Sequence, residues 1–297
     1  MFRRSLTGAI LFLAAAGCGA STDRPQNQVT ATNGTATSVE AKLTLPPSGT
    51  PTSIVRLDCG HADFKDMNGF FSDRPGVYPA GGGKVTDSCY LIRHGDQAML
   101  WDTGLPAATK NQPMQEDGMT ASIQRTLVDQ LAQLGVKAAD IKVVGISHMH
   151  GDHTGQARDF PQARLVIGKE DFDQTAGKDD PFGAWRGSGK PVTASDGDVD
   201  VFGDGDVVTL FLPGHTPGHH ALLVKLKSGN VLLTGDLYHT SMARQKRALP
   251  GFNTSRDQTL ASMDKFEALA KQLNAKVVIQ HEPNDIALLP AFPKAAE

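Results

Sequence analysis

Short apolar runs separated by glycine, aspartate and proline fill the chain from about residue 53 to its end. Two of these runs, residues 88–94 and 97–104, flank Gly95-Asp96, a dipeptide typical of a hairpin turn. Residues 221–227 and 231–235 flank Ser228-Gly229-Asn230 and predict a second hairpin. The other runs that predict strands are residues 142–147, 163–168, 207–212 and 275–280.

Two segments instead repeat their apolar residues at helical spacing. Thr120 is a candidate N-cap for the first predicted helix, which ends at Gly135, and Ser255 with Gln258 has the spacing of a capping box before the second. The apolar stripes are Ile123, Leu127, Val128, Leu131 and Leu134 in the first helix and Leu260, Met263, Phe266, Leu269 and Leu273 in the second. Strands outnumber helices, which lie between groups of strands. The pattern therefore predicts one layered α/β domain.

The N-terminus departs from this pattern and predicts an export signal. Arg3-Arg4 precedes an apolar stretch, residues 6–16, that is too short to span a membrane. The sequence that follows, Ala15-Ala16-Gly17-Cys18, resembles the lipobox of bacterial lipoproteins, in which the cysteine becomes lipidated; ordinary signal cleavage near Cys18 is the alternative. We expect a lipoprotein signal at residues 1–18, a flexible polar tether at 19–52 and a catalytic domain at 53–297. The protein would then be exported and anchored by lipid at the periplasmic face of the cell envelope, or secreted.

Composition narrows the functional classes. The 297 residues include 29 Lys and Arg against 32 Asp and Glu, without a basic cluster, so nucleic acid is not an expected partner. If Cys18 is lipidated, Cys59 and Cys89 remain as a pair, either joined in a disulfide or present as two buried thiols. Ten histidines matter most, because imidazole binds metals and transfers protons near neutral pH.

The strongest local feature is His148-Met149-His150-Gly151-Asp152-His153, directly after the predicted strand 142–147. Three imidazoles and a carboxylate this close together are hard to explain by packing. They suit zinc, and also manganese, iron or cobalt. His215, Asp236 and His281 each follow another predicted strand, where a rigid sheet can hold a site open at its edge. The sequence therefore predicts a metal site.

The motif H-x-H-x-D-H with these three later residues resembles the metallo-β-lactamase superfamily of dinuclear metal hydrolases. The resemblance implies an α/β fold, the αβ/βα sandwich of two mixed β-sheets with helices on the outer faces. It also implies two divalent metal ions, with zinc expected, and a bridging hydroxide as nucleophile. The implied ligands are His148, His150 and His215 for the first ion, Asp152, His153 and His281 for the second, and Asp236 as a bridge. Asp152 would also orient the hydroxide or pass its proton to the leaving group.

The flanking sequences resemble the N-acyl-homoserine lactonases, the quorum-quenching branch of that superfamily. The stretches that carry this likeness are residues 100–104, 213–219, 235–238 and 281–285. The likeness implies hydrolysis of an acyl lactone, with ring opening as the reaction. In many of these lactonases a tyrosine three residues after the bridging aspartate touches the lactone carbonyl. Here that position is His239, preceded by Tyr238, so both are candidate catalytic residues.

Several alternatives stay open. The same centre could serve a broader lactone, ester or organophosphate hydrolase, a thioesterase resembling glyoxalase II, or a metal-binding scaffold protein, and a homodimer is compatible with any of these. The acyl groove has five candidate residues: Met67, Phe70, Phe71, Phe182 and Trp185. The last two lie in a Gly/Pro-rich stretch, residues 177–191, that forms either a lid over the site or a surface loop. His219 and His220 either orient ligands or are structural, and His61 and His94 have no motif partner.

Overall fold

A computed structural model describes residues 49–116 and 118–297. The predicted signal, Cys18 and nearly all of the predicted tether lie outside the described residues. Within the described ranges, every helix is too short or too polar to cross a membrane.

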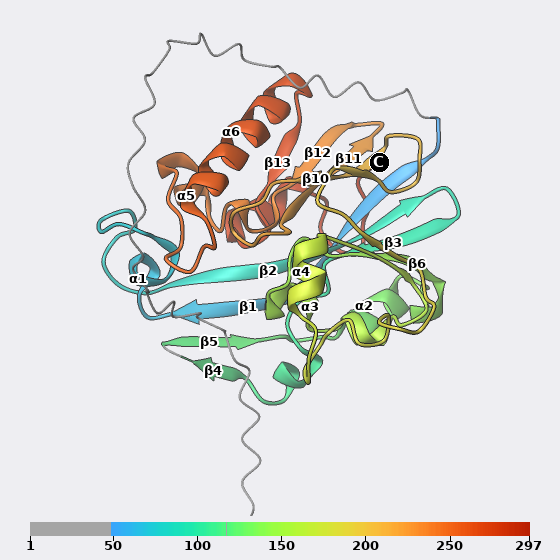
Figure 1. Cartoon of the computed structure of the whole chain (residues 1–297), viewed down its shortest axis with the longest axis horizontal. Coiled ribbons are helices and arrows are strands. Elements are labelled where there is room, and N and C mark those ends of the chain that lie inside the picture. Colours follow the sequence, from blue (N-terminus) through green and yellow to red (C-terminus); the bar gives the residue numbers. More distant parts are fainter. Residues whose placement is uncertain (1–48, 117) are drawn as a thin grey trace, which may run out of the picture. The chain divides into compact units, whose positions relative to one another are not determined.

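Two mixed β-sheets form the domain (Figure 1). The larger sheet has eight strands in the order β4-β5-β1-β2-β3-β6-β7-β8, parallel from β3 to β8 and antiparallel elsewhere. The smaller has five in the order β13-β12-β11-β10-β9, in which β12 and β13 are parallel and the other neighbouring strands are antiparallel. The strands are β1 (Thr52–Phe64), β2 (Gly83–His94), β3 (Gln97–Trp101), β4 (Met114–Glu116), β5 (Met119–Ser122), β6 (Ile141–Gly145), β7 (Arg164–Ile167), β8 (Val192–Ala194), β9 (Val199–Asp200), β10 (Val207–Phe211), β11 (His220–Leu226), β12 (Gly229–Leu233) and β13 (Lys276–Val278).

The two sheets bury one apolar layer between them and carry helices on their outer faces. Tyr90 and Trp101 of the larger sheet pack in one cluster with Leu222 and Leu233 of the smaller. The α-helices are α1 (Met67–Phe71), α2 (Leu127–Gln133), α3 (Gly151–Thr154), α4 (Lys169–Gln174), α5 (Ser241–Lys246) and α6 (Arg256–Gln272), and the 3₁₀ helices are Ala107–Lys110, Ala138–Asp140, Ala157–Asp159, Gly235–Leu237 and Pro283–Leu288. Helix α2 packs on the larger sheet, and α6 lies along the smaller (Figure 1). The predicted αβ/βα sandwich is confirmed.

The two predicted hairpins are confirmed as β2–β3 and β11–β12. The predicted start of the first helix is wrong. Thr120 lies in β5, where it pairs with Asp63 of β1, and the helix begins after Thr126, whose side chain accepts a hydrogen bond from the Asp129 amide. Pairing with a long neighbouring strand, which the local sequence does not reveal, outweighs the helical spacing of residues 120–126.

The prediction that Phe182 and Trp185 line a groove or a lid is also wrong. The two side chains are buried in the apolar cluster on the outer face of the larger sheet, together with Phe160 and Leu165. The Trp185 indole N–H donates to the Ala163 carbonyl oxygen at 2.8 Å. These aromatic residues fix the 177–191 segment to the core, away from the sheet edge that carries the histidine motif.

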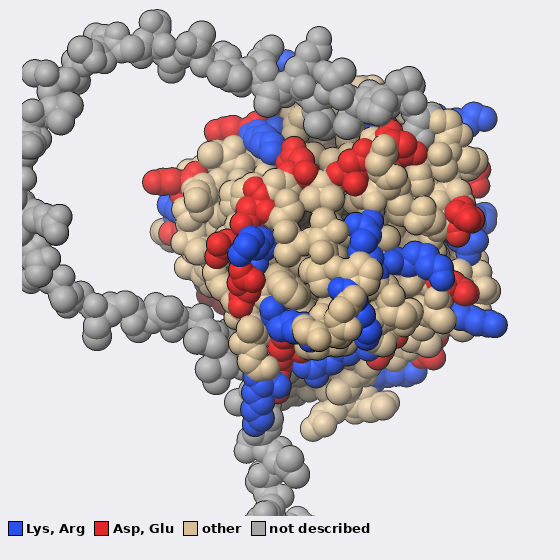
Figure 2. Space-filling view, turned by 45° about the vertical axis from the view of Figure 1, so that its right-hand side comes forward, with Lys and Arg blue, Asp and Glu red and all other residues tan. Residues whose placement is uncertain are grey.

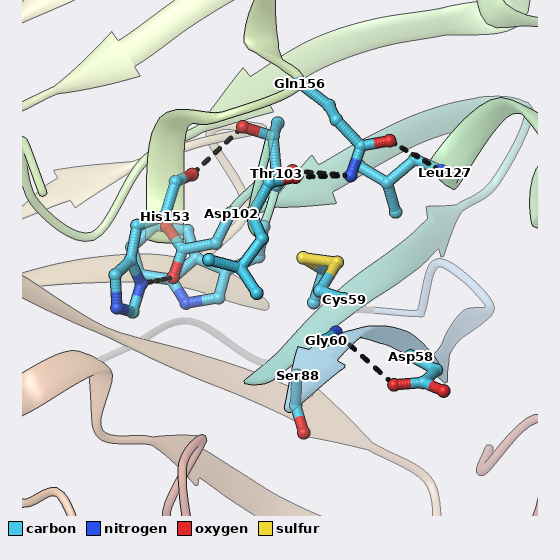
Figure 3. Close-up of a disulfide and its surroundings, with 12 residues drawn as sticks. Asp58, Cys59, Gly60, Ser88, Asp102, Thr103, Leu127, His153 and Gln156 are labelled. Carbon is cyan, nitrogen blue, oxygen red and sulfur yellow. Dashed lines mark hydrogen bonds and ion pairs between the residues drawn. A yellow bond between two sulfur atoms is a disulfide. The ribbon is translucent and has the colours of Figure 1, made fainter. Parts of the chain in front are cut away.

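Cys59 of β1 and Cys89 of β2 form a disulfide, with their Cα atoms 5.7 Å apart. The bond crosses the strands next to an irregularity in their register between Asp58 and Gly60. It also packs against the loop that follows β3 (Figure 3), because a Cβ atom on Gly104 would lie only 2.5 Å from the Cys59 Cβ. Gly104 has φ +66°, so both its conformation and this contact require glycine.

Removing the disulfide by Cys59→Ser with Cys89→Ser should lower the free energy of unfolding by about 3–4 kcal/mol, because a 30-residue loop is then open in the unfolded chain. Urea unfolding monitored by circular dichroism measures this loss. A reductant should weaken the wild type by a similar amount and leave the double variant unchanged. A loss below about 1 kcal/mol would contradict the stabilising role.

Candidate metal centre

Three imidazole nitrogens converge at one edge of the sandwich. His148 Nε2 lies 2.9 Å from His150 Nδ1 and 3.2 Å from His215 Nε2, and the third distance, from His215 Nε2 to His150 Nδ1, is 3.1 Å. A neutral imidazole has one N–H, so hydrogen bonds cannot satisfy three such contacts well. A tetrahedral cation with bonds of about 2.0–2.1 Å separates its nitrogen ligands by roughly this distance. The spacing therefore fits one metal ion.

The loops that carry these rings are joined by Asp171 of α4. Its buried carboxylate accepts hydrogen bonds from the Met149 amide at 3.0 Å, the Gly218 amide at 2.7 Å and the Thr216 hydroxyl at 2.6 Å. Burial raises the pKa of Asp171 to about 6 although these donors oppose the shift. One side chain thus aligns the loop after β6 with the loop after β10.

A second group of ligand atoms lies beside the first. His153 Nε2 and His281 Nε2 are 3.2 Å apart, and Asp152 Oδ2 lies 3.9 Å and 3.7 Å from them. The structure thus brings together all seven residues that the sequence motif singled out, in two sets that share Asp236: His148, His150, His215 and Asp236, and Asp152, His153, His281 and Asp236.

Asp236 lies between the two sets and faces each with one oxygen. Its Oδ2 is 3.4 Å from His215 Nε2, whereas its Oδ1 is 3.0 Å from His281 Nε2 and 3.1 Å from His153 Nε2. Among the described residues, this buried Oδ1 makes no hydrogen bond of good geometry. A carboxylate oxygen left in this state is suited to a cation.

Hydrogen bonds on the far side of each ring set its direction. His153 Nδ1 is 2.9 Å from Asp102 Oδ2, His215 Nδ1 is 2.8 Å from Asn253 Oδ1, and His281 Nδ1 is 2.9 Å from the Thr86 carbonyl oxygen. When these Nδ1–H groups donate, the Nε2 atoms carry the lone pairs that a metal requires.

Two residues behind the rings, Asp102 and Gln280, escaped the sequence reasoning. Asp102 has φ +59°, and this left-handed conformation turns its carboxylate to the Ser147 amide at 2.6 Å as well as to His153. Gln280 donates to Asp102 Oδ2 and accepts from the Gly235 amide, so it joins the supports of both metal groups. The only sequence signal for Asp102 is that it is a carboxylate directly after a strand. The only signal for Gln280 is that it precedes His281.

His219 orients a residue of the centre, as one of its two predicted roles requires, whereas His220 is structural. His219 Nε2 accepts a hydrogen bond from the Asp236 amide at 3.0 Å, and its Nδ1 lies 2.9 Å from the Leu212 carbonyl oxygen. His220 instead lies between the carbonyl oxygens of Gly218 and Gly197. His61 contacts the Ser122 hydroxyl and links β1 to β5.

The two groups differ in their electrostatics before any cation binds. Burial and the neighbouring imidazoles lower the pKa of His148 well below its usual value and that of His150 to about 3. Burial also acts against charge on His281, but the Asp236 carboxylate outweighs it and raises the pKa of His281 to about 9. His148 and His150 therefore favour the deprotonated form that binds a cation, whereas a cation beside His281 must displace a proton.

The family model described as the metallo-beta-lactamase superfamily matches residues 82–281, a range that includes the whole centre. The chain belongs to the metallo-β-lactamase superfamily. Two relatives called N-acyl homoserine lactonase AttM are similar in sequence. The protein from Azorhizobium caulinodans is 38% identical over 57% of this chain and 67% of its own length. The protein from Rhizobium johnstonii is 31% identical over 70% of this chain and 85% of its own length.

Solved structures share this superfamily fold. A quorum-quenching N-acyl homoserine lactone hydrolase aligns with a TM-score of 0.70 over 86% of this chain and 99% of its own, at 20% identity. AidC, described as a dizinc quorum-quenching lactonase, aligns with a TM-score of 0.62 over 85% of this chain and 91% of its own, at 18% identity.

The two candidate catalytic residues next to Asp236 point in different directions in this superfamily member. His239 is buried at the centre, with Nε2 3.0 Å from Asp236 Oδ2 and its ring parallel to that of His281. Tyr238 instead donates its hydroxyl to Glu267 of α6 at 2.9 Å and packs on Phe266. The structure thus places His239 at the metal centre and Tyr238 against the helix layer.

Aromatic side chains border the centre. Phe252 is 42% exposed, and its ring centroid lies 5.8 Å from that of His215 and 6.0 Å from that of His150. Phe70 contacts Phe252, and Phe71 contacts His239. Of the predicted groove residues, Phe70 and Phe71 thus lie at the site, and Met67 packs behind them in the same apolar cluster. Phe252 stands alone in a turn, where no motif or apolar pattern singles it out.

Asp87 is a further buried carboxyl group beside the centre. It is 4% exposed and follows Thr86, whose carbonyl oxygen receives the His281 Nδ1–H. Neither of its oxygens has a hydrogen-bond partner among the described residues. Burial raises the pKa of Asp87 well above its usual range, and charge on His281 and His153 opposes this shift. Burial therefore favours the neutral form of this carboxyl, and positive charge nearby favours its ionisation.

Asp102→Asn should weaken zinc binding about 10- to 100-fold, because the amide supports His153 less well than a carboxylate does. Competition with a chromophoric chelator measures the affinity. Asp96→Asn, in the exposed turn between β2 and β3, is the matched control and should bind zinc as the wild type does. Equal affinities for Asp102→Asn and the wild type would contradict the assigned role of Asp102.

Proposed function

We propose that this protein is a dinuclear-metal lactonase that opens the ring of N-acyl-homoserine lactones. The observation that carries the proposal is the placement of Asp236 between two histidine groups, each of which can hold one ion. Relatives called N-acyl homoserine lactonase, at 31–38% identity, support the choice of substrate. Zinc is the proposed metal, because imidazole and carboxylate ligands suit it.

Two divalent ions at this centre would supply a nucleophilic water at neutral pH and polarise the lactone carbonyl. The chain's own residues account for the rest of the chemistry. His239 Nε2 lies 3.0 Å from Asp236 Oδ2, so a neutral His239 directs its one N–H at the bridging carboxylate and would orient it beneath the lactone carbonyl. The side chain of Asp152 is 35% exposed, against 3% for Asp236, so it is the carboxylate that can pass a proton to the departing alkoxide.

The aromatic border supplies a surface for the acyl chain. Phe252, Phe70 and Phe71 form a continuous apolar wall that begins at His239 and reaches solvent at Phe252. An acyl chain on this wall leaves the lactone ring over the metal centre. Because the wall is apolar and open at one end, it favours a hydrophobic substituent without fixing its length.

Ring opening of N-acyl-homoserine lactones with different acyl lengths tests the activity, monitored by proton release in a lightly buffered solution. Asp236→Asn should lower kcat/KM more than about 100-fold and reduce bound metal, because it weakens the bridge between the ions. Asp96→Asn serves again as the control. Absence of ring opening, with fast turnover of an aryl ester or a phosphotriester, would overturn the lactonase proposal in favour of a broader hydrolase.

Phe252→Ala probes the apolar wall in the same substrate panel. It should raise KM about 10-fold for long acyl chains and less for short ones, because a longer chain buries more apolar surface against this ring. Ile286→Ala, at another exposed apolar position, should change neither. A uniform loss across all chain lengths would place the acyl chain elsewhere.

We also propose that the protein is exported and lipid-anchored at Cys18. The basic pair, the short apolar stretch and the lipobox-like sequence support this proposal. Expression of the full chain in a bacterium with labelled palmitate should label the wild type and not Cys18→Ser. Equal labelling of the two would contradict the lipid anchor and leave ordinary signal cleavage as the explanation.

A further inference from the structure

The Cys59–Cys89 disulfide lies next to a loop that supports the metal centre. This loop, residues 102–106 after β3, contacts both the disulfide and α3, the helix that carries His153 (Figure 3). We propose that the disulfide positions His153 and thereby raises the affinity of the second group of ligand atoms for a divalent ion. This inference rests on the dinuclear centre proposed above, and it does not depend on the identity of the substrate.

The loop after β3 holds both the ring and the backbone of His153. Asp102 Oδ2 lies 2.9 Å from His153 Nδ1. Thr103 donates its amide and its hydroxyl to the His153 carbonyl oxygen, at 2.8 Å and 3.0 Å. The Gly104 carbonyl oxygen accepts from the Gly155 amide at 2.8 Å, so the chain that follows His153 is tied to the same loop. A displacement of the loop therefore displaces His153.

The same loop rests directly on Cys59. A Cβ atom on Gly104 would lie 2.5 Å from the Cys59 Cβ and 2.7 Å from its Sγ, so the Gly104 backbone is packed closely against this side chain. The Leu105 amide donates to the Cys59 carbonyl oxygen at 3.3 Å. The position of Cys59 thus sets the position of the loop.

Cys59 lacks the strand pairing that would fix it without a disulfide. The register between β1 and β2 shifts between Asp58 and Gly60, and Cys59 has no paired residue on β2. An extra residue of this kind is left out of the ladder and bends its strand. Cys89, by contrast, is in regular register with Leu57. The disulfide therefore fixes the unpaired residue to a well-paired position of β2.

Loss of the bond would move the loop in either of two ways. Two thiols need more room than a bonded pair, because unbonded sulfur atoms stay at van der Waals separation. Both cysteines are 0% exposed in an apolar cluster, so this room has to come from neighbours such as Gly104. Smaller side chains instead remove the contact on which Gly104 rests. Ligands have to be held within about 0.5 Å of their productive positions, so a small shift of His153 is enough to weaken metal binding.

The first group of ligand atoms is supported from elsewhere in the fold. Asp171 of α4 joins the loops that carry its three imidazoles. The loop after β3 reaches this group less directly, through the Ser147 amide, which donates to Asp102 Oδ1 at 2.6 Å. Removal of the disulfide should therefore weaken the second group more than the first.

Zinc titration of the full-length, metal-free protein against a chromophoric chelator tests this difference. The titration is done in two backgrounds, His215→Ala, which disables the first group, and His281→Ala, which disables the second. Cys59→Ser with Cys89→Ser should lower the zinc affinity about 10-fold in the His215→Ala background, because the support of His153 is loosened. In the His281→Ala background the change should stay below about twofold. Replacing both cysteines by alanine should give the same pattern.

Ile54→Ala is the matched control for a general loss of stability. Ile54 lies in the same strand β1, is 0% exposed and packs between the two sheets, so this substitution should lower the Tm and leave the zinc affinity of the His215→Ala background unchanged. Circular dichroism verifies that each variant is folded during the titration. Equal zinc affinity with and without the disulfide in that background, or an equal loss on Ile54→Ala, would overturn the positioning role.

The wild-type titration separates this inference from the proposed centre. The wild type should bind two zinc ions. Binding of one ion would overturn the dinuclear centre and this inference together. Two ions, with affinities that do not change when the disulfide is removed, would overturn this inference alone and leave the proposed function in place.

Discussion

Three imidazole nitrogens held within 3.2 Å of one another are the constraint around which the active edge of this domain is organised. Lone pairs at this spacing repel, and burial removes the water that would screen them. The arrangement persists because each of the three rings is also fixed elsewhere, by hydrogen bonds to its other nitrogen or to the loop that carries it. The fold therefore provides a preformed site for positive charge. The affinity of this site for cations follows from the close spacing of the three imidazole nitrogens.

That receptor depends on supports that reach deep into the sandwich. Thr103 donates both its amide and its hydroxyl to the His153 carbonyl oxygen, and the next residue, Gly104, packs against Cys59 of the disulfide. Figure 3 shows the disulfide, Asp102, Thr103 and His153 in one neighbourhood. The disulfide between β1 and β2 is thus connected through Gly104 and Thr103 to the loop that carries His153. By contrast, the outer surface in Figure 2 mixes acidic and basic side chains, and no single charge dominates that face.

The apolar pattern predicted a layered α/β domain, because it depends on residues close in the chain. The resemblance of the histidine motif to a known family implied the two-sheet sandwich and the seven residues of the centre. Hairpins such as β2–β3 are specified by their own turn residues. The errors arose where distant pairing decided the outcome. Thr120 joined β5 because β1 was available beside it, and Phe182 and Trp185 filled a space that only the folded sheet creates. Asp102, Gln280 and Phe252 were missed for the same reason, since their partners are remote in sequence.

Asp87 can influence the electrostatic potential at the metal centre without being one of its candidate ligands. Its carboxyl group lies close enough to His281 and His153 for their charges to act on it, yet it contacts neither and makes no hydrogen bond among the described residues. A group in this position contributes to the electric potential at the centre without occupying a coordination position. The charge at residue 87 therefore bears on the centre although this residue is outside the two sets of candidate ligands. Evolution or a designer could use that single strand position to shift the balance between tight metal retention and easy metal exchange.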